Sequence, residues 1–272
     1  MTIGYQGEPF SYSHRVAGKR FPGVDSVGFP SFQATFDALA EGRVDRLVMP
    51  IENSTTGSIL PVLDRLLTHD VHITGEHLEE IQHALLAHPG ATLETIRTVH
   101  SHPQALSQAE STITRYGWDA QPEHDTAGAV RLVAERGDPA EACLAHPDSA
   151  EAHGLVVLLR NVVDRPHNTT RFVMLEPGPA VEVPDDADKT SLTFEAAHTP
   201  GSLAMALVEL GLRGANLSRI ESRPTEEAWR YRMFVDINHR PGRAGFEAVF
   251  EPMPLHLTNV TFLGTYRAAQ EA

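Results

Sequence analysis

The sequence predicts an α/β protein with largely parallel strands, followed by a smaller domain with a different order of elements. Strand-like and helix-like apolar segments alternate from the first residue to about residue 175. Residues 176–188 are rich in proline and acidic residues and lack periodicity, which is typical of a linker. The order of segments changes at Lys189, which indicates the start of a separate domain.

The first block begins with a predicted strand at Ile3–Gly7. A helix follows, with Ser31 placed to cap its start and Gly42 just beyond its end. Arg46–Met49 predicts the next strand, and residues 50–58 predict a polar loop. The helix after this loop carries its apolar residues on one face, at Ile59, Leu63, Leu66 and Leu67.

A second block starts near residue 75. Thr98–His100 predicts a strand that leads into Pro103, which suits the first turn of a helix bearing Leu106 and Ile113. A further helix, capped by Asp125 or Thr126 and stopped by Gly137, precedes strand, helix and strand patterns at 142–145, 147–154 and 156–159. Arg171–Leu175 predicts the closing strand, and two such blocks form a cleft where small ligands bind.

The C-terminal segments alternate in a different order. They predict strand, helix, strand, strand, helix and strand at 191–195, 201–210, 217–222, 229–238, about 244–250 and 260–266. This order is that of a split βαβ, ferredoxin-like domain.

Charge and composition exclude several classes of partner. The 272-residue chain has 22 basic and 36 acidic residues, a formal net charge of −14, so we expect no nucleic acid. Without an apolar stretch near 18 residues or a secretory leader after Met1, we expect no membrane partner. A single cysteine, Cys143, excludes an intramolecular disulfide and favours a cytoplasmic location.

Four polar segments fall at ends of predicted strands: 50–54, 101–104, 125–127 and 168–172. Judged singly, a hydroxyl or amide at such a place is most often a helix cap. The sequence contains 15 histidines, but no cysteine or carboxylate recurs beside them at metal-ligand spacing, so we expect no metal.

Taken together, three of these motifs resemble prephenate dehydratase. They are Pro-Ile-Glu-Asn-Ser-x-x-Gly at 50–57, Ser-His-Pro-Gln-Ala at 101–105 and Thr-Arg-Phe at 170–172. The resemblance implies loss of CO2 and water from prephenate to give phenylpyruvate, without metal or organic cofactor. It further implies a catalytic domain at 1–178 resembling a type 2 periplasmic-binding-protein fold, with lobes at about 1–75 plus 165–178 and at 76–164, and a linker at 179–189.

The resemblance also assigns site residues. Thr170 is the expected donor of a proton to the departing hydroxyl. The residues expected to bind substrate are Glu52, Asn53, Ser54, Ser101, Gln104, Gln108, Thr126, Arg171 and Phe172. Arg171 points to the opposite face of a strand from Thr170, so it either touches substrate or braces the cleft. We expect His102 to be an architectural hydrogen-bonding residue rather than a base.

Residues 190–268 resemble an ACT domain of the phenylalanine-responsive kind, through Pro200–Leu203 and Asn216–Pro224. The resemblance implies L-phenylalanine as an allosteric effector and a homodimer or homotetramer. The expected effector-binding residues are Gly201, Ser202, Leu203, Asn216, Leu217, Glu221 and Ser222. Glu221 contacts the effector's ammonium group or holds the loop; alternatively, it forms a structural surface ion pair with Arg223.

The chain departs from the family pattern at three positions. Phe10 stands where a glycine is usual and removes access to a positive φ, Ala109 replaces a common cysteine, and Ser202 replaces the usual alanine. Two other functions remain open: an arogenate dehydratase and a non-catalytic amino-acid-binding regulatory protein. A fusion to a chorismate mutase is not expected, because no helical domain precedes Thr2.

Overall fold

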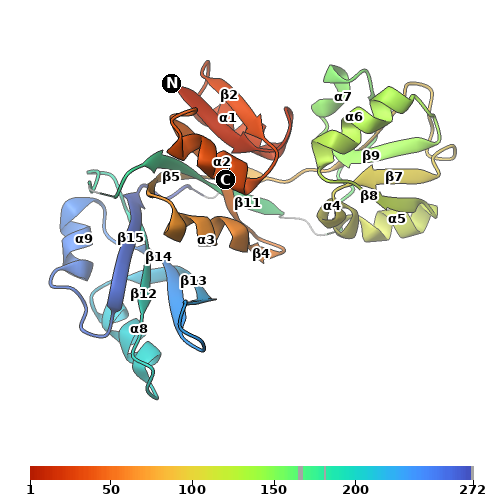
Figure 1. Ribbon diagram of the computed structural model, residues 1–272. Helices are drawn as coiled ribbons and strands as arrows, with labels where there is room; N and C mark the ends of the chain where they lie inside the picture. The colour runs from red at the N-terminus through yellow and green to blue at the C-terminus, as the bar shows by residue number, and fades with distance from the viewer. Residues whose placement is uncertain (165–167, 181, 271–272) are drawn as a thin grey trace.

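The computed structural model describes residues 1–164, 168–180 and 182–270, which form three sheets (Figure 1). The strand orders are β2-β1-β3-β11-β5 with β4 beside β3, then β10-β6-β9-β7-β8, then β13-β14-β12-β15. The second sheet and its helices lie to one side of the first, and the third sheet lies beneath it in the view of Figure 1. The sequence predicts that residues 165–167 belong to the first lobe and residue 181 to the linker. Both lie outside the described residues.

The sheet of the first lobe is formed by two separate stretches of the chain, residues 2–80 and 169–177. Its strands are β1 (Thr2–Gln6), β2 (Asp25–Phe29), β3 (Arg46–Asn53), β4 (Gly57–Ser58), β5 (Val71–Glu80) and β11 (Thr169–Pro177). Its helices are α1 (Tyr12–Arg20), α2 (Phe32–Ala40) and α3 (Leu60–Thr68). Ser31 caps α2 by accepting a hydrogen bond from the Ala34 N–H, which confirms that part of the sequence prediction.

The prediction of largely parallel strands is wrong for this sheet. β11 runs antiparallel to both β3 and β5, because β5 leaves the first lobe and β11 returns to it. The prediction of a loop at 50–58 is also wrong, because β3 continues through Asn53. Its pairing with β11 shifts register beside Pro50, where Arg171 pairs with Glu52 and Phe172 with Pro50, so Ile51 is an extra residue in a bulge. The sequence did not predict α1 or β2.

The second lobe also has a mixed sheet. Its strands are β6 (Ala84–Ala87), β7 (Thr98–Ser101), β8 (Asp119–Pro122), β9 (Glu141–Ala145) and β10 (Val156–Leu159). Its helices are α4 (Pro103–Gln108), α5 (Glu110–Tyr116), α6 (Thr126–Arg136) and α7 (Ser149–Ala152). The single helix predicted from Pro103 to Ile113 is two helices, because the backbone turns at Ala109. Asp125 caps α6, and Gly137 ends it in the left-handed conformation.

The third sheet follows the predicted order of elements. Its strands are β12 (Lys189–Glu195), β13 (Asn216–Pro224), β14 (Tyr231–Asn238) and β15 (Thr258–Tyr266), with helices α8 (Ser202–Leu212) and α9 (Gly242–Phe250). All strand pairs in this sheet are antiparallel, and β13 and β15 form its edges. This is the strand order of a ferredoxin-like domain.

One hydrophobic core joins the first lobe to the third sheet. Phe234, Leu263 and Tyr266 of the third sheet belong to the same buried cluster as Phe36 and Leu63 of the first lobe. At Gly264 the two sheets approach so closely that an added Cβ would lie 2.1 Å from the Ile73 carbonyl oxygen. The third sheet is therefore packed directly against the first lobe rather than tethered to it.

Candidate functional site

A cavity of about 340 Å³ lies between the two lobes. Residues from both lobes line it, including Tyr12, Asn53, Thr56, His83, His102, Gln104, Gln108, Asp125, Thr126, Thr170 and Phe172. Six of the residues expected to act on substrate thus meet in one place: Asn53, Gln104, Gln108, Thr126, Thr170 and Phe172.

Asn53 and Thr170 form a buried pair at the ends of β3 and β11. They are opposite each other in the strand pairing, and their exposed fractions are 4% and 8%. The Asn53 Nδ2 donates to the Thr170 Oγ1 at 2.9 Å and to the Asn168 Oδ1 at 2.8 Å. The Thr170 oxygen accepts this hydrogen bond, and its own O–H has no acceptor among the described residues. The hydroxyl proton is therefore available to an acceptor in the cavity.

The same amide organises the loop beside it. The Asn53 Oδ1 accepts from the Thr55 N–H at 3.0 Å and from the Thr55 hydroxyl at 2.6 Å. Across the cleft, Gln104 Nε2 donates to the Thr56 hydroxyl at 2.9 Å, and the Asn168 amide donates to the Gln108 Oε1 at 2.8 Å. Beside Asn53, the contacts between the two lobes are thus made by uncharged amides and hydroxyls.

The cavity wall has no cationic side chain among the described residues that line it. Two helices of eight or more residues begin there instead: α1, whose first turn contributes Ser11 and Tyr12, and α6, whose start contributes Asp125 and Thr126. Free backbone N–H groups and the helix dipole make such ends suitable for carboxylates.

His83 and Tyr12 were missed by sequence reasoning. His83 is 3% exposed, and its Nδ1 has no hydrogen-bond partner among the described residues. Burial lowers the pKa of the His83 imidazole to about 4, against a smaller opposing effect of the Gln108 side chain. Burial likewise raises the pKa of Tyr12, whose hydroxyl donates to the Gln82 carbonyl at 2.6 Å. Both side chains are therefore neutral at pH 7. Neither lies in one of the four polar segments.

His102 lies where an architectural residue is expected. It is the N-cap of α4, and its Nδ1 accepts from the Gln104 N–H at 3.2 Å. Burial lowers the pKa of its imidazole, with Asp125 acting in the opposite direction. The neutral ring therefore fixes the start of the helix that carries Gln104 and Gln108.

Four expected substrate-binding residues do not line the cavity. Ser101 is completely buried and donates to the Leu144 carbonyl at 2.7 Å, so it braces β7 against β9. Ser54 accepts from the Thr169 N–H at 2.9 Å and joins the two strand ends. Glu52 and Arg171 point to the opposite face of the sheet, where they pair at 3.0 Å. The alternation along β3 and β11 explains their position.

The conformation at Phe10 corrects another expectation. Its φ is +69°, so it keeps the left-handed conformation that the missing glycine would have favoured. Its N–H donates to the His14 Nδ1 at 3.0 Å, and its ring packs edge-on against His153 of the second lobe at 5.2 Å. Contacts with both lobes hold Phe10 in a backbone conformation that bulky residues rarely adopt.

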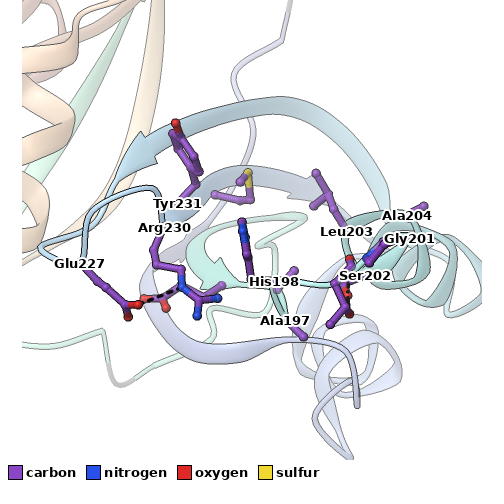
Figure 2. A pocket seen from close by; sticks show the side chains of 14 residues that line it. Ala197, His198, Gly201, Ser202, Leu203, Ala204, Glu227, Arg230 and Tyr231 are labelled. Atoms are coloured by element: carbon purple, nitrogen blue, oxygen red, sulfur yellow. Dashed lines mark hydrogen bonds and ion pairs between the residues drawn. The ribbon is translucent and has the colours of Figure 1, made fainter.

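A second pocket, of about 620 Å³, opens on the third sheet beside the start of α8 (Figure 2). Gly201, Ser202 and Leu203 line it, as the sequence predicted, together with His198, Arg230 and Tyr231. The other expected effector residues, Asn216, Leu217, Glu221 and Ser222, lie on β13 away from this pocket. Glu221 accepts from the Ser58 hydroxyl at 2.9 Å, and Arg223 pairs with Asp64 at 2.7 Å, so the suggested Glu221–Arg223 ion pair is wrong.

Within residues 1–164, 168–180 and 182–270, no group of three or more His, Cys, Asp or Glu side chains is arranged to hold a metal ion. Over the same ranges, none of the helices has the length and apolar character needed to span a membrane.

The fold and the cavity define a class: a two-lobed α/β protein with a cavity between its lobes that is lined largely by polar side chains. A family model described as prephenate dehydratase matches residues 3–180, well over half of the chain. The chain belongs to the prephenate dehydratase family.

Known relatives agree with this assignment. "Arogenate dehydratase/prephenate dehydratase 2, chloroplastic" of Arabidopsis thaliana is 40% identical over 82% of this chain, and the matched region spans only 59% of that protein. "Bifunctional N-acyl-homoserine lactone acylase/prephenate dehydratase" of Komagataeibacter europaeus is 33% identical over 98% of this chain and 96% of its own. The crystal structure of prephenate dehydratase in complex with L-Phe from Arthrobacter aurescens is 28% identical, with a TM-score of 0.86, covering 100% of this chain and 92% of that one.

Proposed function

We propose that this protein is a prephenate dehydratase, with Thr170 as the group that protonates the departing hydroxyl. One observation carries the proposal. The Thr170 oxygen accepts a hydrogen bond from the buried Asn53 amide, while its O–H faces a cavity without an acceptor among the described residues. An accepted hydrogen bond polarises a hydroxyl and makes its proton a better donor.

The reaction requires few groups from the protein. As the bond between the ring and its carboxylate breaks, CO2 departs and the electron pair moves into the ring. The ring C–O bond breaks, and the hydroxyl leaves as water with the Thr170 proton. Thr170 recovers a proton from solvent, so one proton is consumed for each CO2 and water released. Positioned proton donation of this kind contributes about 10²–10⁴-fold to the rate.

Carboxylate binding falls to neutral donors. In this proposal the starts of α1 and α6 receive the two carboxylates, with Thr126 at the second of these sites. Gln104 and Gln108 are one helical turn apart on α4 and reach from the second lobe toward Thr56 and Thr55. Closure of the lobes around the substrate would exclude water and strengthen these contacts.

Arogenate is the second candidate substrate. It carries an ammonium group where prephenate has a keto oxygen, and such a group requires an acceptor. The Asp125 carboxylate lines the cavity, although its Oδ1 already caps α6 at 2.7 Å from the Gly128 N. Relatives about 40% identical to this chain are named arogenate dehydratases, which also favours this substrate.

We further propose that residues 190–268 form an ACT domain that binds L-phenylalanine. The ferredoxin-like strand order supports this proposal, as does the pocket at Gly201–Leu203, where α8 begins. A relative of known structure is described as a complex with L-Phe. Because part of the expected site lies on the edge strand β13, away from the pocket, we propose a homodimer or homotetramer in which a second copy completes it.

The decisive experiment compares the two substrates without added metal. Purified full-length protein is incubated with prephenate or arogenate, and phenylpyruvate or phenylalanine is measured. We expect phenylpyruvate, formed more slowly when phenylalanine is present at saturating concentration. Turnover of arogenate alone would replace prephenate by the second candidate, and turnover of neither would refute a dehydratase. An unchanged rate with phenylalanine would refute the regulatory proposal.

A further inference from the structure

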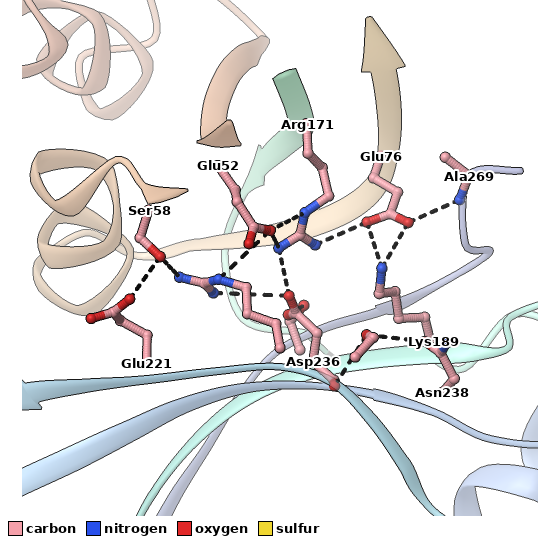
Figure 3. A network of polar contacts seen from close by, with 12 residues as sticks. Glu52, Ser58, Glu76, Arg171, Lys189, Glu221, Asp236, Asn238 and Ala269 are labelled. Atoms are coloured by element: carbon pink, nitrogen blue, oxygen red, sulfur yellow. Dashed lines mark hydrogen bonds and ion pairs between the residues drawn. The ribbon is translucent and has the colours of Figure 1, made fainter. Parts of the chain in front are cut away.

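A buried network of charged side chains lies behind the cavity, between the first lobe and the third sheet (Figure 3). Arg171 is at its centre. Its guanidinium contacts Asp236 of β14 at 2.6 Å, Glu76 of β5 at 3.0 Å and Glu52 of β3 at 3.0 Å. A single side chain thus connects three strands of two different sheets.

The network lies directly behind the proposed catalytic pair. In the pairing of β3 with β11, Asn53 is opposite Thr170 and Glu52 is opposite Arg171. The first pair faces the cavity and the second faces the third sheet, because successive residues of a strand point to opposite faces. The two pairs share the same backbone, next to the bulge at Ile51.

The third sheet contributes a matching set of groups. Arg219 of β13 lies 3.8 Å from Asp236 and 3.9 Å from Glu52, and it donates to the Ser58 hydroxyl at 2.9 Å. Ser58 is opposite Glu52 in the pairing of β3 with β4. Glu52 is therefore held by contacts from β11 and β13 together.

Burial makes this network sensitive to the loss of any member. The exposed fractions of the side chains are 8% for Arg171, 6% for Arg219 and 2% for Asp236. Burial alone would raise the pKa of Asp236, but Arg171, Arg219 and the Ser191 hydroxyl outweigh it, so the pKa is lowered and the group is a carboxylate. Removing a partner from a buried charge leaves that charge uncompensated, which forces neighbouring groups to move.

We propose that the third sheet positions Asn53 and Thr170 from behind. Asp236 and Arg219 are positioning residues, and neither touches the cavity. Their contacts fix the positions of Arg171 and Glu52. Because Arg171 and Glu52 are the chain neighbours of Thr170 and Asn53, fixing them also fixes the backbone of the pair on the cavity side. This inference rests on the proposed function, and it assigns to the third sheet a part in turnover that does not depend on any effector.

The same interface offers a matched control. Arg223 of β13 forms a two-point ion pair with Asp64 of α3, at 2.9 and 2.7 Å. It joins the same two parts of the molecule and is partly exposed, but it contacts neither β3 nor β11. If turnover requires only that the third sheet stays attached to the first lobe, loss of the Arg223–Asp64 pair and loss of the Asp236–Arg171 pair should have similar effects on turnover.

The experiment compares Asp236→Asn, Glu52→Gln and Arg223→Gln in the full-length protein, using whichever of the two substrates the wild type consumes. We expect kcat to fall roughly 10-fold or more for Asp236→Asn and by a smaller factor for Glu52→Gln, with KM within about threefold, because a displacement near 1 Å suffices for losses of this size. We expect kcat within about twofold of wild type for Arg223→Gln. Cooperative thermal unfolding establishes that each variant is folded.

The results would contradict the proposed positioning role in either of two cases. Wild-type kcat in folded Asp236→Asn and Glu52→Gln would overturn the inference, and so would an equal loss in Arg223→Gln. If Asp236→Asn does not fold, Glu52→Gln decides alone, since its side chain is 35% exposed and tolerates loss of charge. A wild-type protein that consumes neither substrate refutes the proposed function, a result independent of the variants.

Discussion

The two faces of β3 and β11 are built from different chemistry. On the cavity side, Asn53 and Thr170 interact through uncharged groups, and the polar side chains around them are amides, hydroxyls and neutral imidazoles, with Asp125 as the one carboxylate among the described lining residues. On the other side, Glu52 and Arg171 take part in a network of full charges that pair with one another. One residue along the strand separates these two environments.

In the proposed function, this difference lets the cavity receive an anion with no cationic side chain among its described lining residues. Arg171 and Arg219 of the buried network already face carboxylates. Among the described residues, the cavity side keeps polar atoms without partners, as the Nδ1 of His83 and the O–H of Thr170 show. In this proposal, charged groups stabilise the structure on one face of the strands, and uncharged hydrogen-bonding groups contact the substrate on the other.

The largest expected effect comes from removing the cavity-side hydroxyl. Thr170→Val keeps the shape of the side chain but cannot donate a proton, so we expect kcat to fall about 10²–10⁴-fold. Thr112→Val is a suitable control, because within the described ranges the Thr112 hydroxyl has a single hydrogen bond, to the Val162 carbonyl at 3.4 Å. Steady-state turnover of both folded variants measures the effect, and near-wild-type kcat in Thr170→Val would contradict the assignment.

A smaller effect is expected on the pH dependence of the free energy of unfolding, because the buried His83 imidazole on the cavity side is neutral. The pKa of His83 is about 4 in the folded protein and about 6.5 when unfolded, so between these values only the unfolded chain binds the proton. The free energy of unfolding should therefore decrease by about 3 kcal/mol as pH falls from 6.5 to 4. Urea unfolding at several pH values should show a shallower decrease for His83→Asn than for wild type or for His124→Asn, whose side chain is 77% exposed. Equal slopes in all three would contradict a buried neutral imidazole.

The smallest effect is expected where charge is exposed. Arg131 and Glu8 join the two lobes at 3.1 Å, but their side chains are 54% and 40% exposed. Arg131→Gln should change the free energy of unfolding by less than about 0.5 kcal/mol, because solvent screens such pairs. A loss of several kcal/mol in urea unfolding would show that exposed charges between the lobes matter as much as the buried network.

The sequence predicted the order of most elements and part of the cavity. The motif residues Asn53, Gln104 and Thr170 lie together because they stand at the end of β3, the start of α4 and the start of β11, all of which meet at the cleft. Ser101 was misplaced because a motif does not specify which way a side chain at a strand end points; its hydroxyl donates to the Leu144 carbonyl instead. Arg171 lies on the face opposite Thr170, as the alternation along a strand predicts, and its partners brace that side of the cleft.

Other features had no local signal. His83 is brought to the cavity by the position of β6 relative to α1, which no segment of sequence encodes by itself. The partners of Arg171 come from three strands far apart in the chain, so only tertiary packing brings them together. Helix α1 escaped prediction because its apolar residues are few, with Val16 and Ala17 as its buried pair beside Gly18.

Phe36 of the first lobe and Phe234 of the third sheet lie in one core, so each of these two parts of the protein depends on the other for its packing. The family match ends at residue 180, yet a fragment cut there would lose Phe234, Leu263 and Tyr266 from that core and would leave Arg171 without Asp236. The residues of the family match therefore do not complete that core on their own. An exchange of the third sheet between relatives would have to include the faces of β14 and β15 that complete this core.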